Sequence, residues 1–106
     1  GEKVFPEEVE EVLKQHPDVE DALVVGLPDE QWGQAVTGVV TLRPGALLDE
    51  DGLRTLVRRQ MAGYKTPKRV VACDRVFRAP NGKADYKAAR EHALRALADG
   101  ANPATR

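Results

Sequence analysis

The chain is poor in the residues that build most catalytic and metal centres. Its 106 residues include one cysteine and two histidines, and aromatic side chains make up 5% of the sequence. One cysteine allows neither an internal disulfide framework nor a cysteine-ligated zinc site within a single chain. A serine–histidine–aspartate pattern, an HExxH motif, a P-loop and a GxGxxG motif are all missing. None of these common catalytic or nucleotide-binding centres is therefore expected.

Neither sign of charge is in excess, and long apolar runs are absent. The 16 Lys and Arg side chains nearly balance the 17 Asp and Glu side chains, giving a formal net charge of −1. General nucleic-acid and membrane-surface binders usually need a strong basic excess, so neither partner is expected. The sequence shows no stretch of membrane-spanning length and no signal peptide. A cytoplasmic, reducing compartment fits best, with Cys73 as a buried structural thiol.

The length is that of one small domain with a single modest core. The sequence opens on glycine and reaches a predicted helix within a few residues, as a processed natural chain or a domain taken from a longer protein would. Its last residues, DGANPATR, predict a frayed or disordered tail. We therefore expect one domain over residues 1–98, followed by a tail over residues 99–106.

Hydrophobic periodicity predicts both helices and strands. Helices are predicted from Pro6 to before Pro17, from the N-cap Asp49 to about Gly63, and from the N-cap Asp85 to about Leu97. Apolar, β-branched runs predict strands over 22–28, 35–42 and 69–73. The predicted fold class is α+β: a small mixed β-sheet of about three strands plus a possible hairpin, with helices packed on it.

The polar residues of the predicted helices suit structural roles. The glutamates at positions 7, 8, 10 and 11 complement the positive end of the first helix and predict a solvated face. His16 stands near the end of that helix, where a partial positive charge is favourable, so capping is expected rather than catalysis. His92 is expected to be exposed or packed on the last helix.

One loop, MAGYKTPKR at residues 61–69, combines an aromatic ring with several cations. Tyr64 is flanked by Lys65, Lys68 and Arg69. A ring can stack on a base while amines contact phosphates, so nucleotide binding is one interpretation. In the other, Tyr64 packs on the sheet and the lysines are solvated.

A second loop carries Lys83 in the segment RAPNGKADY, residues 78–86. Pro80, Asn81 and Gly82 all favour turns, which predicts an exposed loop at Lys83. From the residues alone, two interpretations stay open. Lys83 is either one more solvated charge or a lysine presented by the loop to a site elsewhere.

Three segments together resemble the C-terminal domain of adenylate-forming enzymes, which include acyl-CoA synthetases, luciferase and the adenylation domains of peptide synthetases. Residues 1–36, GEKVFPEEVEEVLKQHPDVEDALVVGLPDEQWGQAV, resemble the start of that domain. AGYKTPKRV resembles its G-[YF]-K-x-P-[KR] segment, and RAPNGKADY resembles its final signature ending in G-K. The resemblance is strongest to bacterial fatty-acid-type acyl-CoA ligases, and the segments occur in the family's order.

The resemblance implies a two-step reaction that a larger domain of the same chain shares. A carboxylic acid and ATP give an acyl-adenylate and pyrophosphate, and coenzyme A then takes the acyl group and releases AMP. The family's G-K lysine falls on Lys83, which would screen the repulsion between the carboxylate and the α-phosphate. A fatty or steroid-like acyl substrate is implied. Mg²⁺ is expected in the full-length enzyme but not on this domain, for which no metal ligands are predicted.

The resemblance also implies contacts to coenzyme A, made after the domain has changed orientation. Gly1 would lie beside the pantetheine arm, and Trp32 near its channel, with a core anchor as the alternative for Trp32. Tyr64 would contact the adenine, and Lys65 and Lys68 would hold phosphates.

The sequence also departs from the family pattern. Phe77, Arg78 and Ala79 stand where the family often has Pro-Arg-Thr or Pro-Arg-Ser, and Thr66 replaces an arginine of some relatives. The first alternative is a peptide-synthetase adenylation domain, whose acceptor is a carrier protein. The second is a non-catalytic α+β binding module.

Overall fold

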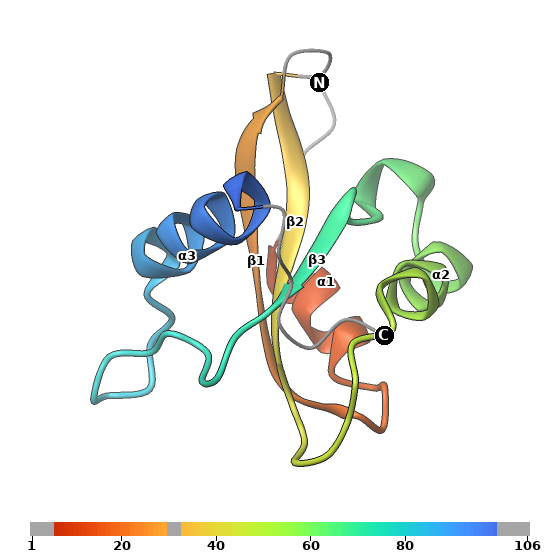
Figure 1. Cartoon of the computed structure of the whole chain (residues 1–106). Helices are drawn as coiled ribbons and strands as arrows, with labels where there is room; N and C mark the ends of the chain where they lie inside the picture. Colours follow the sequence, from red (N-terminus) through yellow and green to blue (C-terminus); the bar gives the residue numbers. More distant parts are fainter. Residues whose placement is uncertain (1–5, 30–32, 100–106) are drawn as a thin grey trace.

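The computed structural model describes residues 6–29 and 33–99, which form a mixed α/β arrangement in a single unit (Figure 1). The elements are α1 (Pro6–Leu13), β1 (Val19–Asp29), β2 (Gly33–Leu42), α2 (Glu50–Gln60), the 3₁₀ helix η1 (Gly63–Lys65), β3 (Arg69–Ala72) and α3 (Tyr86–Ala98). Every predicted helix and strand is present, and the α+β fold class is confirmed. Residues 100–106 of the expected tail lie outside the described residues, while Asp99 forms the C-cap of α3.

The strands form one open sheet in the order β1-β2-β3. β1 and β2 pair as an antiparallel hairpin, from Val19 opposite Leu42 to Asp29 opposite Gly33. β3 lies parallel to β2 on its other side. An isolated bridge between Arg78 and Ala84 closes a further short hairpin outside the sheet. The sheet is therefore mixed, with one small additional hairpin, as predicted.

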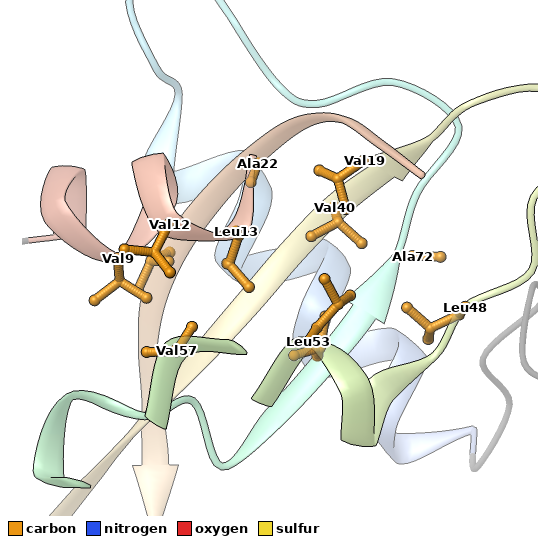
Figure 2. Close-up of a cluster of buried hydrophobic side chains, with 12 residues drawn as sticks. Val9, Val12, Leu13, Val19, Ala22, Val40, Leu48, Leu53, Val57 and Ala72 are labelled. Atoms are coloured by element: carbon orange, nitrogen blue, oxygen red, sulfur yellow. The ribbon is translucent and has the colours of Figure 1, made fainter. Parts of the chain in front are cut away.

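One face of the sheet is covered by α1 and α2. Their apolar stripes pack on alternate strand residues to form a buried cluster, part of which is labelled in Figure 2. Leu13 and Leu53 lie at its centre, with at most 1% of their surface exposed. Gly38 lets α1 approach β2 closely, since a Cβ at this position would lie 3.2 Å from Leu13 Cδ1.

The opposite face is covered by α3, whose small residues Ala89 and Ala93 lie against the sheet in a second cluster. His92 is packed, as one interpretation predicted. Its ring lies 5.6 Å from that of Phe77, and its Nε2 is 2.9 Å from the Ala72 carbonyl oxygen. Cys73 is half-buried rather than fully buried, and desolvation raises the pKa of its thiol.

The predicted solvated face of the first helix is wrong at Glu10, which is only 6% exposed. Glu10 Oε2 accepts hydrogen bonds from the Val24 N–H at 2.9 Å and from the Tyr86 hydroxyl at 3.0 Å. The physical reason is that β1 is an edge strand, whose outward N–H groups need acceptors. Burial raises the pKa of Glu10, and burial with the Glu10 contact raises the pKa of Tyr86 to about 12.

His16 contacts the end of α1 through its backbone and not through its ring, since its N–H donates to the Leu13 carbonyl at 3.1 Å. α1 ends at Leu13, earlier than the expected boundary before Pro17. The His16 Nδ1 instead accepts a hydrogen bond from the Asp18 N–H at 3.1 Å. His16 therefore stabilises the turn that leads into β1.

Candidate functional site

The predicted site residues fall into two groups that the structure does not bring together. Lys83 lies on the hairpin between β3 and α3, while Tyr64, Lys65 and Lys68 lie in the segment between α2 and β3. In Figure 1 the sheet separates the 74–85 loop from η1. Gly1 and Trp32 lie outside the described residues, so their roles stay predictions.

The turn before Lys83 is well defined by local hydrogen bonds. The Gly82 N–H donates to the Ala79 carbonyl at 2.8 Å, and the Ala79 N–H donates to the Lys83 carbonyl at 2.8 Å. The Lys83 N–H donates to Asn81 Oδ1 at 3.1 Å. Gly82 has a φ of +86°, a conformation that favours glycine. The predicted turn is confirmed, and it fixes the backbone from which the lysine projects.

The Lys83 side chain is exposed. Over residues 6–29 and 33–99, its ammonium forms no ion pair. Asp85, two residues further on, is occupied as the N-cap of α3. The lysine thus presents an uncompensated positive charge at the tip of a hairpin, where it could meet an anionic group from outside this domain.

The base of the hairpin is bound to β1 by Arg78. Its Nε and Nη2 contact the two carboxylate oxygens of Asp21 at 2.9 and 3.0 Å. Its Nη1 donates to the Gly82 carbonyl at 3.1 Å. The guanidinium holds the pKa of Asp21 below its ordinary value, and the carboxylate raises the pKa of Arg78.

Tyr64 stands on η1 with 48% of its surface exposed. The Lys65 Nζ lies 5.9 Å from the centre of the tyrosine ring and 3.2 Å from Glu8 Oε2. About half of the tyrosine surface is therefore covered, so both interpretations of Tyr64, stacking on a base and packing on the sheet, stay open. The ring is accessible for stacking on a planar ligand.

Lys68 is ion-paired rather than simply solvated. Its Nζ lies 2.6 Å from Asp29 Oδ2, and its backbone N–H donates to the Val36 carbonyl at 2.7 Å. The Lys68 side chain is 51% exposed while that of Asp29 is 11% exposed. A phosphate that binds Lys68 must therefore compete with a carboxylate already in place.

A groove of about 870 Å³ opens beside these residues. The end of the β1–β2 hairpin supplies an apolar side, including Val25 and Val36. Tyr64, Lys68 and two arginines of α2, Arg54 and Arg58, supply the polar side. A groove with one apolar side, bordered by cations and an accessible ring, can hold an anionic ligand with a planar base.

Arg54 and Arg58 were not predicted as binding residues. Their spacing of four places both on one side of α2, which is the signal that could have found them. Arg54 Nε also donates to the Pro67 carbonyl at 2.9 Å, which fixes the segment next to Lys68. The groove also contains Thr66, whose buried Oγ1 has no partner among the described residues.

Residues 6–29 and 33–99 contain no group of three or more His, Cys, Asp and Glu side chains arranged to hold a metal ion. None of the helices in these two ranges has the length and apolar character needed to cross a membrane.

Curated proteins are similar to this chain in sequence. A 3-oxocholest-4-en-26-oate–CoA ligase of Rhodococcus rhodochrous is 54% identical over 86% of this chain and 16% of its own length. A medium/long-chain-fatty-acid–CoA/3-oxocholest-4-en-26-oate–CoA ligase of Mycobacterium tuberculosis is 54% identical over 86% of this chain and 17% of its own. The chain spans about a sixth of the length of these curated relatives.

Solved structures agree with these sequence matches. The amide bond synthetase McbA from Marinactinospora thermotolerans has a TM-score of 0.78 at 39% identity, over 84% of this chain and 18% of that one. A fatty acyl CoA synthetase from Mycobacterium tuberculosis has a TM-score of 0.78 at 33% identity, over 87% of this chain and 18% of that one. Residues 8–83 match the family described as the AMP-binding enzyme C-terminal domain. The chain belongs to this family of AMP-binding enzyme C-terminal domains.

Proposed function

We propose that this chain acts as the C-terminal domain of an ATP-dependent acyl-CoA synthetase. The observation that carries the proposal is Lys83, exposed on a defined hairpin and without an ion pair among the described residues, in a chain that belongs to this family. The relatives are about five times as long as the chain, which supports a large ATP-binding domain as its partner in the parent enzyme. The overall reaction would convert a carboxylate, ATP and coenzyme A into acyl-CoA, AMP and pyrophosphate.

Lys83 would act in the first half-reaction. A carboxylate oxygen of the substrate attacks the α-phosphate of ATP, and pyrophosphate leaves. Both reactants are anionic, so an ammonium aimed between them reduces their repulsion and stabilises the charge of the transition state. A compact charge on a flexible stem suits a residue that enters a site formed mostly by another domain.

The groove beside Tyr64 would act in the second half-reaction, in which the thiol of coenzyme A attacks the acyl carbonyl and AMP leaves. The residues present fit this ligand, since an exposed ring can stack on adenine and the bordering cations can meet phosphates. Lys65 and Lys68 would exchange Glu8 and Asp29 for phosphate oxygens. Gly1 and Trp32 would lie along the pantetheine arm. Mg²⁺ would belong with ATP on the larger domain.

The substrate would be a fatty or steroid-type carboxylic acid, because the names of similar proteins include medium- and long-chain fatty acids and a cholestenoate. The expected compartment is the cytoplasm. The expected alternative acceptor is a carrier protein, as in peptide synthetases, and Tyr64 followed by Lys65 favours coenzyme A over it. Replacing coenzyme A by a carrier protein in the assay separates the two.

The first prediction is that residues 1–106 alone catalyse neither half-reaction. The reason is that the sequence lacks an ATP-binding motif and the proposed catalytic lysine needs a site from another domain. Pyrophosphate release with ATP and a panel of fatty and steroid acids measures this, with the parent enzyme as the positive control. Turnover by the isolated chain would contradict the proposed function, as would a parent enzyme that forms no acyl-CoA from any acid.

A further inference from the structure

We propose that Asp21 is a positioning residue for Lys83 and acts on it through Arg78. This inference rests on the proposed function, because it assigns Asp21 to the same half-reaction as Lys83. Asp21 lies on β1, while the lysine hairpin belongs to the chain after β3. The contact, between residues 57 positions apart, orients a hairpin whose Val76 and Phe77 also pack in the second cluster with residues of β1.

The direction of the Asp21 carboxylate is fixed by its strand. The register of the β1–β2 hairpin shifts between Val19 and Asp21, so Glu20 forms a bulge directly before Asp21. A bulge changes the direction of the side chains that follow it. Asp21 Oδ1 also accepts the Ala22 N–H at 2.8 Å, which restrains the carboxylate further. Asp21 thus offers a fixed pair of oxygens at the edge of the sheet.

The Arg78 guanidinium connects this carboxylate to the lysine's own backbone. Two of its nitrogens contact Asp21 at 2.9 and 3.0 Å, in the paired geometry that fixes orientation as well as distance. The third nitrogen donates to the carbonyl of Gly82, the residue directly before Lys83, at 3.1 Å. Movement of the guanidinium therefore moves the backbone from which Lys83 projects.

The other hydrogen bonds among the described residues of the hairpin are local. The bonds of Ala79 with Gly82 and Lys83 shape the turn, and the Asp85 N–H donates to the Phe77 carbonyl at 2.9 Å. They set the shape of the hairpin but do not attach it to β1. Exposed ion pairs contribute little to folding stability. The main effect of the Asp21–Arg78 pair is therefore to orient the hairpin.

Placement of a reacting group governs its rate contribution strongly, and a displacement of about 1 Å can cost about 10²-fold. We expect Asp21→Asn in the parent enzyme to lower the single-turnover rate of acyl-adenylate formation about tenfold. Thioester formation from a supplied acyl-adenylate should stay unchanged, and so should the KM for ATP. Arg78→Lys should have a similar effect, because one ammonium cannot hold both Asp21 and the Gly82 carbonyl.

Glu50→Gln is the matched control. The Glu50 carboxylate also accepts from an arginine Nε, that of Arg69 at 2.8 Å, and from a strand N–H, that of Val70 at 2.8 Å. Its side chain is 24% exposed and that of Asp21 is 29% exposed. Breaking this pair should leave the rate of adenylate formation unchanged.

The decisive comparison adds Asp21→Asn to Lys83→Ala. If Asp21 acts through Lys83, it has no further effect on adenylate formation once the lysine is gone. An equal loss in both backgrounds, an equal loss in both half-reactions, or a fully active Asp21→Asn beside a crippled Lys83→Ala would overturn the inference alone. A fully active Lys83→Ala would overturn the proposed function and this inference together.

Discussion

Glu10 places a carboxylate where α1, the edge of β1 and the start of α3 meet. Glu10→Ala leaves the Val24 N–H and the Tyr86 hydroxyl without their acceptor. Loss of a buried partner of this kind costs about 1–3 kcal/mol. We expect the free energy of unfolding to fall by about that amount at pH 7, measured by urea denaturation. Glu11→Ala, on the exposed side of the same helix, is the control and should change it by less than about 0.5 kcal/mol.

The pH dependence of the same residue has a definite sign. Burial raises the pKa of Glu10 above 4.5, so the folded chain holds the proton more tightly than the unfolded chain. This contribution to stability is present below pH 4.5 and is lost as the pH rises through the folded pKa. Glu10→Gln cannot titrate. The free energy of unfolding of Glu10→Gln minus that of the unaltered chain should therefore rise from about pH 4.5 to pH 7. A fall in this difference over the same range would contradict the raised pKa of Glu10.

Tyr64 gives a second test at a single residue. Tyr64→Ala in the parent enzyme should weaken thioester formation at least tenfold, because base stacking is typically worth ~1–3 kcal/mol. Lys68→Ala should act on the same step. The measurement is the KM for coenzyme A together with the single-turnover rate of thioester formation. Tyr64→Phe keeps the ring and is the control, and unchanged values for Tyr64→Ala would exclude this groove as the coenzyme site.

At the scale of elements, α2 is held to the sheet by Leu53, which is 1% exposed in the cluster of Figure 2. Leu53→Ala should lower the free energy of unfolding by ~2–5 kcal/mol, the usual cost of removing a buried leucine side chain. Leu47→Ala removes the same atoms from a residue that is 53% exposed and should have little effect. Thermal and urea unfolding measure the free energy of unfolding of both variants. Equal losses of stability would contradict the placement of Leu53 in the core and of Leu47 at the surface.

The elements themselves were predictable where the signals are local. Asp49 and Asp85 were expected as N-caps, and their carboxylates accept the Gly52 and Ala88 N–H groups. The pairing of β3 with β2 is different, because it joins segments that are distant in sequence and no local pattern specifies it. The bulge before Asp21 depends on the same long-range register.

In the candidate site, too, features set by local sequence were predictable and contacts between distant residues were not. The turn and the exposed loop at Lys83 follow from a short segment, whereas the sequence left the exposure of the Tyr64 ring open. The carboxylate partners of Lys65 and Lys68 lie 57 and 39 residues away, so the sequence could not identify them. Glu10 was missed for the same reason, since its partners Val24 and Tyr86 come from other elements.

At the scale of the whole molecule, the two groups of proposed functional residues lie on different parts of the domain. Lys83 stands on the hairpin before α3, and the groove lies beside η1 and α2. One small domain would thus serve two successive steps with different surfaces. Damage to each surface should therefore affect one half-reaction and spare the other.

The most direct test is single-turnover kinetics of both half-reactions on Lys83→Ala in the parent enzyme. Acyl-adenylate formation should fall by about 10²–10³-fold, because one aimed charge is lost from the transition state. Thioester formation from a supplied acyl-adenylate should stay close to that of the unaltered enzyme. Lys83→Arg should restore little, since a wider planar group replaces a compact charge. Equal losses in both half-reactions, or no loss in either, would contradict the role of Lys83 as the adenylation lysine.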